Sequence, residues 1–139
     1  MAARLAIIAT AITSNIAFWS SSFAAGDADI GSLGDKMSGA FKCSIYASMF
    51  HDQKEQQRLF QIGSKAGRDF VEGMKGRTDP DPSVGAMLAF VRGVSTDFMV
   101  GTMYESEATK AFDEIPMGPT AEKNQAEVIY RKSNCSSIQ

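Results

Sequence analysis

Apolar residues recur every three or four positions along most of the chain after about residue 33, which is the spacing of amphipathic helices. In the first such segment, up to residue 50, Cys43 lies beside an apolar face made of Met37, Ala40, Phe41, Ser44, Ala47 and Phe50. The most regular segment, 53–75, has a stripe made of Leu59, Ile62, Ala66, Phe70 and Met74. Asp52, followed three residues later by Glu55, predicts a capped start for this second helix.

Two prolines separate this pair of helices from the rest of the chain. Pro80 and Pro82 bar helical continuation, and Ser83 is the expected cap of a third helix that ends near Gly93. The inward residues predicted for this third helix are Val84, Met87, Leu88 and Val91.

A fourth helix is expected from Ser95 or Thr96 onward. Its predicted inner face is Phe98, Gly101, Ala108, Phe112 and Ile115, with Val100, Tyr104 and Ala111 at the border. After a turn at 116–119, Thr120 is the expected cap of a last helix that carries Ala126, Ile129 and Tyr130 and leads to Cys135. No sustained alternation of period two occurs, so we predict an all-α fold, a compact bundle of four or five short helices.

The first 24 residues have the composition of an export signal. Arg4 provides a positive start, an apolar run of 15 residues extends from Leu5 to Trp19, and Ser22-Phe23-Ala24 supplies a cleavage site. A retained membrane anchor is the alternative, but it needs about 20 apolar residues. We predict a signal peptide over 1–24, a flexible leader over 25–32 and a single helical domain over 33–139, periplasmic or secreted.

Export would bring the two cysteines of the chain into an oxidising compartment. Cys43 and Cys135 lie about 92 positions apart, which suits neither a CxxC redox centre nor a clustered metal site. We predict a disulfide that joins the first helix to the end of the chain. An intermolecular disulfide and two free thiols are the alternatives.

The net charge of the chain limits the kinds of molecule that it is expected to bind. Cleavage removes one cation and no acid, which leaves 13 Lys+Arg against 16 Asp+Glu and a net charge near −3. A mildly acidic chain without a basic cluster does not attract nucleic acid or anionic lipid. We therefore expect no nucleic-acid partner and no stable membrane insertion after cleavage.

Two glycines one turn apart interrupt the helix predicted over 53–75. Each lowers helix propensity by about 1 kcal/mol relative to alanine, so we expect them to admit a closely packed helix, with the fourth helix as neighbour. An open groove for a partner or ligand is the alternative. The candidate face for helix packing or binding consists of Gly63, Gly67, Arg68, Asp97, Gly101 and Tyr104, with Arg68 and Asp97 as a possible ion pair between the helices.

Catalytic motifs are missing from the sequence. It contains no HExxH, GxSxG, P-loop or GxGxxG motif, and its one histidine, His51, stands at a helix junction typical of a solvated turn. A catalytic pair of acids could form in space from Asp69, Asp97, Glu105 and Glu107, although charge on the exposed faces of helices explains them as well. We assign no catalytic, cofactor-binding or metal-binding residue and expect no cofactor.

A resemblance rests on short segments spread over the chain. They are Phe41-Lys42-Cys43-Ser44, Leu59-Phe60 with Gly63, Gly67-Arg68 with Phe70, Ser95 with Asp97-Phe98 and Gly101, and Tyr130 with Asn134-Cys135. In this order they resemble uncharacterised small exported helical proteins of proteobacteria and their prophages, and the resemblance implies no activity. In architecture alone, the chain is similar to periplasmic immunity proteins of type VI secretion, which neutralise cell-wall-degrading toxins.

These features predict an exported, non-catalytic helical protein that binds another periplasmic or secreted protein, in its sharpest version an immunity-like inhibitor. An accessory of envelope or phage assembly is one alternative. A second is a cell-wall-acting enzyme with scattered carboxylates, which would need a cleft where two or more acids converge. A third is a structural homo-oligomer, signalled by an exposed apolar patch of more than a few hundred Å².

Overall fold

The computed structural model describes residues 20–115 and 118–139, and within them no strand occurs. The elements are α1 (Ser20–Met49), α2 (Gln53–Lys75), α3 (Pro82–Gly93), α4 (Thr96–Asp113), α5 (Pro119–Lys132) and the 3₁₀ helix η1 (Cys135–Ser137). The prediction of an all-α bundle with four or five helices and one disulfide is confirmed.

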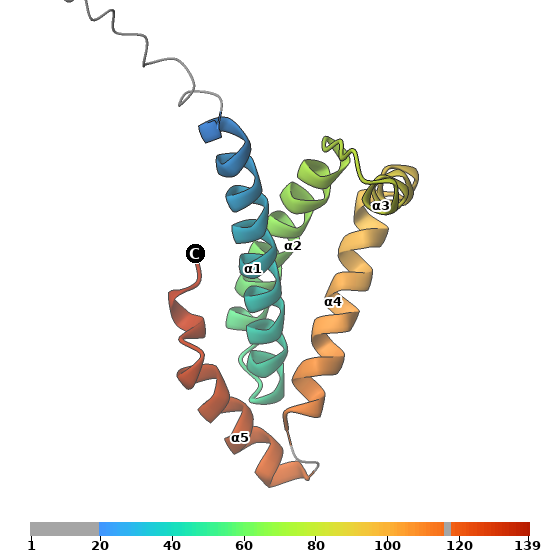
Figure 1. Cartoon of the computed structure of the whole chain (residues 1–139). Helices are drawn as coiled ribbons and strands as arrows, with labels where there is room; N and C mark the ends of the chain where they lie inside the picture. The colour runs from blue at the N-terminus through green and yellow to red at the C-terminus, as the bar shows by residue number, and fades with distance from the viewer. Residues whose placement is uncertain (1–19, 116–117) are drawn as a thin grey trace, which may run out of the picture.

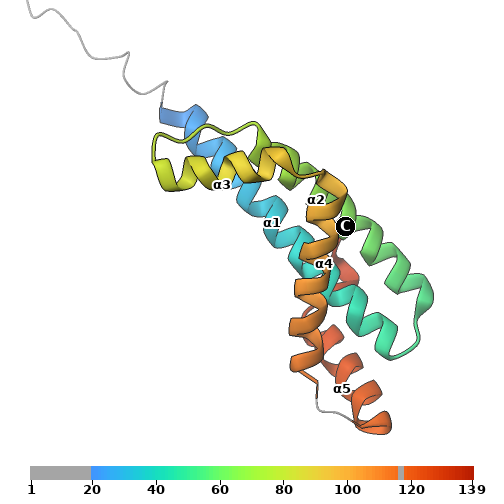
Figure 2. The ribbon, with the colours of Figure 1, turned by 90° about the vertical axis from the view of Figure 1, so that its right-hand side faces the viewer.

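The long helices α1 and α2 form an antiparallel pair, and α4 packs against both of them (Figure 1). α5 turns back along α1 and leads to η1. α3 packs on α2 and lies across the top of α4 (Figure 2), because the chain bends by 110° at the break between α3 and α4.

The buried side chains form two clusters. One surrounds the disulfide and contains Cys43, Ile45, Tyr46, Leu59, Ala111, Ile115, Ala126 and Cys135. The other lies toward α3 and contains Met37, Phe41, Ala66, Val71, Val91 and Val100. Tyr104 packs against both clusters, so the bundle has a continuous core. We call the two regions the disulfide end and the α3 end.

The predicted disulfide joins Cys43 of α1 to Cys135 of η1 within one chain, with Cα atoms 5.6 Å apart. Both residues are buried. A disulfide is compatible with an oxidising compartment. Among the described residues, no single helix is long and apolar enough to cross a bilayer; α3 and α4 meet that test only when taken together as a bent pair.

The start of α1 corrects the predicted flexible leader over 25–32. α1 begins at Ser20 and not near Leu33, so these residues are helical. Ile30 packs against α2 where Gly73 has no side chain, since a Cβ there would lie 3.2 Å from Ile30 Cγ1. Contact with α2 thus outweighs the low helix propensity of the glycines in this stretch. The predicted cleavage site after Ala24 falls near the start of α1, and residues 1–19 of the predicted signal lie outside the described residues.

The N-terminal caps agree with the predictions in part. Asp52 accepts a hydrogen bond from the Glu55 amide at 3.0 Å, and Ser95 caps α4. The cap of α3 is Asp81 and not Ser83, because Pro82 suits the first helical position and Asp81 accepts from the Ser83 amide. α5 likewise begins at Pro119, one residue before the expected cap at Thr120.

The predicted inner face of α4 is confirmed at Ile115, which is buried, and at Ala108, which packs against the core, but it is wrong at Phe98, Gly101 and Phe112. Phe98 and Phe112 are 61% and 54% exposed, and Gly101 is exposed as well. The buried residues of this region are Val100, Glu107, Ala111 and Ile115. These side chains point inward because α4 packs against both α1 and α2. Phe98 and Phe112 are consequently left on the surface, and among the described residues Phe60 of α2 and Phe90 of α3 are exposed as well.

Candidate functional site

An apolar groove with a volume of about 390 Å³ lies between α2, α3 and α4. Its lining consists of Phe70, Val71, Met74, Met87, Phe90, Val91, Met99 and Met103. We call it the methionine groove, since four of the eight methionines of the chain line it. Methionine side chains are flexible and polarisable and adapt to apolar surfaces of different shapes.

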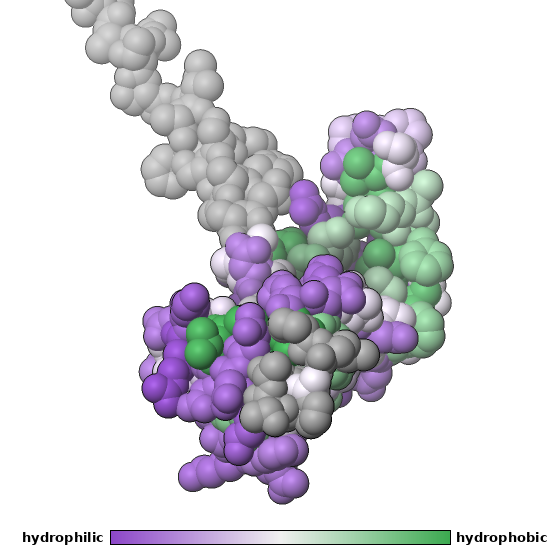
Figure 3. All heavy atoms as spheres, turned by 90° about the horizontal axis from the view of Figure 1, so that it is seen from below, coloured by the Kyte–Doolittle hydropathy of each residue, from purple (hydrophilic) through white to green (hydrophobic). Residues whose placement is uncertain are grey.

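α3 forms the outer wall of this groove. Leu88 is fully buried, whereas Met87 and Phe90 are 49% and 63% exposed, which contradicts the inward position predicted for Met87. The one charged residue of α3 is Arg92, and its guanidinium donates to the backbone carbonyls of Lys75, at 3.0 Å, and Arg77. In the view from below (Figure 3), apolar colours extend along the side of the molecule on which α3 lies.

Sequence reasoning missed the methionine groove. A usable signal was present, because α3 carries a single charge in 12 residues and four methionines fall in the segments that meet there. By periodicity alone, these apolar residues predict an ordinary core face. Only the packing of α3 on α2, with its other side left open, shows that part of this apolar surface is exposed.

Gly63 and Gly67 are the buried residues of the predicted face, and both allow close helix packing. The helix that packs there is mainly α1 and not the expected α4. A Cβ on Gly63 would lie 2.6 Å from Cδ1 of Phe41. A Cβ on Gly67 would lie 3.1 Å from Sδ of Met37 and 3.3 Å from Cγ2 of Val100. The expected contact with α4 therefore exists at Gly67 alone, because the long α1 helix runs beside α2 and its side chains fill the space that both glycines leave.

Three other residues of the predicted face, Arg68, Asp97 and Gly101, are exposed to solvent. The predicted ion pair is present, with 3.0 Å between Arg68 Nε and Asp97 Oδ1, and both side chains are exposed. Nothing lies within 4 Å of the position that a Cβ on Gly101 would take. Tyr104 is half-buried, packs edge-on against Phe60 and Phe41 at 5.2 Å between ring centroids, and its burial raises its pKa.

Exposed aromatic side chains lie along one side of α4 and on α2. Phe98, Gly101, Glu105 and Phe112 follow one side of α4 at helical spacing, away from the buried line of Val100 and Ala111. Phe60 of α2, which is 43% exposed, extends the surface beside Tyr104. We call the surface made by Phe60, Arg68, Asp97, Phe98, Gly101, Tyr104 and Phe112 the aromatic face.

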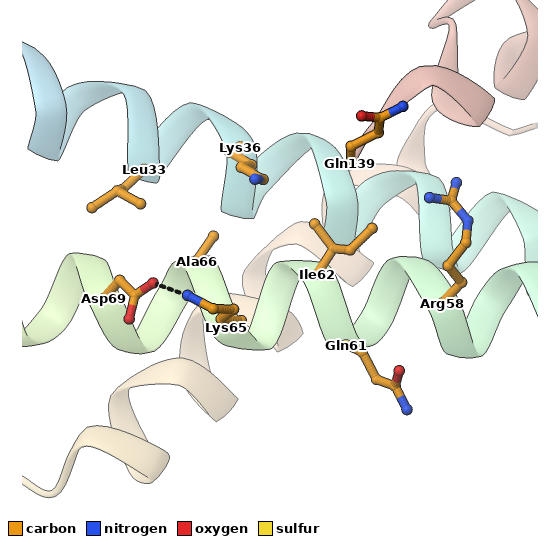
Figure 4. A pocket seen from close by; sticks show the side chains of 9 residues that line it. All are labelled: Leu33, Lys36, Arg58, Gln61, Ile62, Lys65, Ala66, Asp69 and Gln139. Atoms are coloured by element: carbon orange, nitrogen blue, oxygen red, sulfur yellow. Dashed lines mark hydrogen bonds and ion pairs between the residues drawn. The ribbon is translucent and has the colours of Figure 1, made fainter.

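A second pocket, of about 310 Å³, lies between α1 and α2 near the C-terminal residue (Figure 4). Its lining is Leu33, Lys36, Arg58, Gln61, Ile62, Lys65, Ala66, Asp69 and Gln139. Lys65 is paired with Asp69 at 2.7 Å. Arg58 is bound to Glu55 and to backbone carbonyls near the end of the chain. Two of its three cationic side chains are thus already paired within the protein.

The acids considered as a catalytic pair do not converge. Asp69 binds Lys65, Asp97 binds Arg68, and Glu107 binds Lys110 at 2.7 Å. Within the described part of the chain, no group of three His, Cys, Asp or Glu residues is placed to hold a metal ion. Asp69, Asp97 and Glu107 therefore act as ion-pair partners, and Glu105 lies on the exposed side of α4.

The only histidine, His51, occupies the predicted turn between α1 and α2. It is exposed and has a left-handed backbone with φ 66°, which lets the Asp52 amide donate to the Ala47 carbonyl at 3.0 Å and end α1. This geometry agrees with the solvated-turn interpretation.

Two hydrogen-bonded networks that sequence reasoning did not identify hold the disulfide end together. In the first, Glu114, just after α4, accepts from Lys42 and from the hydroxyl of Tyr46 in α1. The Lys42 ammonium, followed by the Tyr46 hydroxyl, lowers the pKa of Glu114. Burial, followed by the hydrogen bond to Glu114, raises the pKa of Tyr46.

In the second network, Glu55 accepts from Arg58, with 2.8 Å between Arg58 Nε and Glu55 Oε2, and from the hydroxyl of Tyr130. The Arg58 hydrogen bond is the main cause that lowers the pKa of Glu55. Burial, together with the bond to Glu55, raises the pKa of Tyr130 to about 12. Arg58 also donates to the Ile138 carbonyl at 2.5 Å, so this network ties α5 and the end of the chain to α2.

Comparisons of the chain with protein-family models, with curated proteins and with solved structures found no match, so the contacts and exposed surfaces described above are the basis for a functional assignment.

Proposed function

We propose that this protein is exported to the periplasm or secreted and acts there by binding another protein through its aromatic face, without catalysing a reaction. The observation that carries the proposal is the exposure of Phe60 of α2 and of Phe98 and Phe112 near the two ends of α4, the two helices that the Arg68–Asp97 ion pair joins. Aromatic residues and arginine are enriched at the centres of protein interfaces, because they bury a large area on contact.

The chemistry of the face indicates what a partner has to present. An apolar side chain of the partner would fit above Gly101, where the surface is open, with Phe98 on the same side of α4. Arg68 and Asp97 expose one positive and one negative group, so polar groups of both signs at the edge of the contact would complement them. These features suit a folded protein surface better than a nucleic acid, whose phosphates carry one sign.

The backbone beneath the aromatic face is firmly held. Gly67 of α2 packs directly against Val100 of α4 and Met37 of α1, and Tyr104 is wedged between Phe60 and Phe41. A rigid surface loses little conformational entropy on binding and so retains more of its contact energy as affinity. This property and the disulfide, together with the proposed export, support an immunity-like inhibitor of a cell-wall-degrading toxin as the sharpest form of the proposal.

Export is tested first, by expressing the full chain in a Gram-negative host and measuring the mass of the protein from each cell fraction. We expect a periplasmic product that begins at Ala25 and carries an oxidised Cys43–Cys135 pair. An unprocessed cytoplasmic product with two free thiols would contradict the proposed location.

Binding is tested by capturing partners of the processed protein from periplasmic extract. Three forms are compared: wild type, Phe98→Glu on the aromatic face, and Phe90→Glu on α3 as a control with nearly the same exposure. We expect Phe98→Glu alone to lose the partner. The identified protein is then purified and its affinity measured, with an expected loss of at least about tenfold for Phe98→Glu, equivalent to about 1.4 kcal/mol.

Two outcomes would overturn this assignment of the aromatic face. One is an affinity for the purified partner that Phe98→Glu leaves unchanged. The other is a loss of affinity in the Phe90→Glu control alone, which would move the binding site to α3. If the partner is a cell-wall hydrolase, its activity in the presence of the protein further tests the inhibitor version.

A further inference from the structure

The exposed side of α3 lacks the polar character of an ordinary surface helix. Leu88 and Val91 fill its inner side, and its exposed residues include Ala86, Met87, Ala89 and Phe90. A helix that is apolar on all sides is normally buried in a larger assembly. The methionine groove continues this apolar surface on to α2 and α4, which makes it one contiguous patch.

We propose that a second copy of this chain covers this patch, so that the protein is a two-fold symmetric dimer held by α3 and the methionine groove. The aromatic face then remains free for the partner protein, since it lies on the other side of α4 from Met99 and Met103. The dimer is therefore a separate property from the binding proposed above.

The absence of available charge on α3 favours a second copy over a different protein. Its one charged side chain, Arg92, is turned back to the carbonyls of Lys75 and Arg77. Interfaces between different proteins gain their specificity from complementary charges. A two-fold contact needs no such pair, because the same patch on each copy meets itself and apolar surface complements apolar surface.

The size of the patch agrees with a modest dimer. A large side chain such as phenylalanine buries about 150–250 Å², and about half to two-thirds of Met87 and Phe90 is exposed. With the neighbouring alanines and the groove wall, the patch offers on the order of 400 Å² of apolar surface in each copy, comparable to the largest apolar patch of a typical monomer, which is often functional. Two such patches and a polar rim reach about 1,200 Å², the lower end of specific interfaces.

The groove also has room for side chains of a second copy. A cavity of about 150 Å³ holds a benzene ring, and the methionine groove measures about 390 Å³. The exposed Phe90 ring of one copy can therefore enter the groove of the other while the four methionines adjust around it.

The test is sedimentation velocity of the processed protein, obtained by expression of the full chain, over about 1–200 µM, a range that brackets a micromolar dissociation constant. We expect a monomer–dimer equilibrium for wild type and for Phe98→Glu, the matched control on the aromatic face. Phe90→Glu should weaken the dimer by at least about tenfold, because each copy would bury a carboxylate in an apolar contact. Circular dichroism of Phe90→Glu verifies its helix content, and Ala86→Glu serves as a second variant on the same side of α3.

A wild-type protein that stays monomeric over this range, or a dimer that both α3 variants leave intact, would overturn the proposal while leaving partner binding untouched. Flotation of a monomeric wild type with phosphatidylcholine vesicles, lost in Phe90→Glu, would assign the patch to a lipid surface and overturn it as well. Failure of partner capture with an intact dimer would instead overturn only the function proposed for the aromatic face.

Discussion

At the disulfide end, Cys135 is fully buried and bonded to Cys43, and Arg58 binds the carbonyl of Ile138. At the α3 end, α3 is anchored by the buried side chains of Leu88 and Val91, and Phe90 extends into solvent. One end is closed by a covalent bond and charged hydrogen bonds, and the other presents adaptable apolar side chains. The contrast indicates that the disulfide end is the more firmly held of the two regions.

The tyrosines make two kinds of contact: hydrogen bonds at the disulfide end and ring contacts between the two ends. Tyr46 and Tyr130 donate to Glu114 and Glu55 at the disulfide end, so their hydroxyls fix the geometry between helices. Tyr104, between the two ends, is held through ring contacts. Polar bonds between helices specify one arrangement because they depend on direction, whereas apolar contacts tolerate adjustment.

The largest effect is expected from breaking the disulfide. Because the bond closes a loop of 92 positions, Cys43→Ser should lower the free energy of unfolding by about 2–5 kcal/mol while the helical circular dichroism signal persists. Hydrogen exchange should accelerate in α5 and η1 and change little in α3. Thermal melts and exchange measurements check both points, with the Cys43→Ala/Cys135→Ala variant as control for the buried hydroxyl. Equal acceleration at both ends would contradict the division into two regions.

The next effect is expected from filling the glycines of α2. Gly63→Ala places a Cβ against the fully buried ring of Phe41 and should lower the free energy of unfolding by about 1–3 kcal/mol. Gly101→Ala, on an open surface, is the matched control and should raise it by up to about 1 kcal/mol through helix propensity. Urea denaturation measures both changes.

Substitutions at Gly67 test whether this part of α2 is closely packed or forms an open groove. Gly67→Leu should lower the free energy of unfolding by about 1–3 kcal/mol, because it meets Met37 and Val100. Gly67→Ala should be milder, since the thioether of Met37 can shift. An unchanged or higher melting temperature for Gly67→Leu would refute the packing contact.

A smaller effect is expected from pH, and at the disulfide end it should involve Glu55 and Tyr130. The pKa of Glu55 is lowered in the folded state, so its stabilising contribution is present above the unfolded value near 4.5 and is lost as pH falls below it. The pKa of Tyr130 is raised from 10.0 to about 12, so its contribution is present below pH 10 and is lost as pH rises from 10 to 12. Melting curves from pH 3 to 12 should show both losses, and Tyr130→Phe should flatten the alkaline one. An alkaline limb of the same steepness in Tyr130→Phe would exclude Tyr130 as its source.

The smallest effect is expected from the Arg68–Asp97 ion pair. Both side chains are exposed, 59% and 78%, and such pairs contribute at most about 1 kcal/mol. A double-mutant cycle with Arg68→Ala and Asp97→Ala should give a coupling energy below this value that declines with added salt. A larger, salt-independent coupling would mean that the aromatic face is part of the stabilising framework.

Local features of the sequence determined much of the fold. The spacing of Leu59, Ala66 and other apolar residues, with the cap at Asp52, predicted α2 with both of its ends. The prolines at 80 and 82 and the caps near Ser95 likewise located α3 and α4 to within one or two residues. These signals succeed because helix periodicity and capping depend on residues within a few positions of one another. The Arg68–Asp97 ion pair was predicted from the opposite charges of its residues, and the Cys43–Cys135 disulfide from the presence of two cysteines.

Tertiary packing decided the features that depend on contacts between distant segments. It placed Ile30 of α1 against α2 at Gly73, filled the space beside Gly63 with Phe41 of α1, and rotated Phe98 out of the core. It also left the methionine groove open, which no periodicity within α3 could reveal, because an apolar side chain is buried or exposed according to whether another helix covers it. The sequence therefore determined the helices, whereas the arrangement of the helices determined which apolar residues form the core and which form surfaces available for binding.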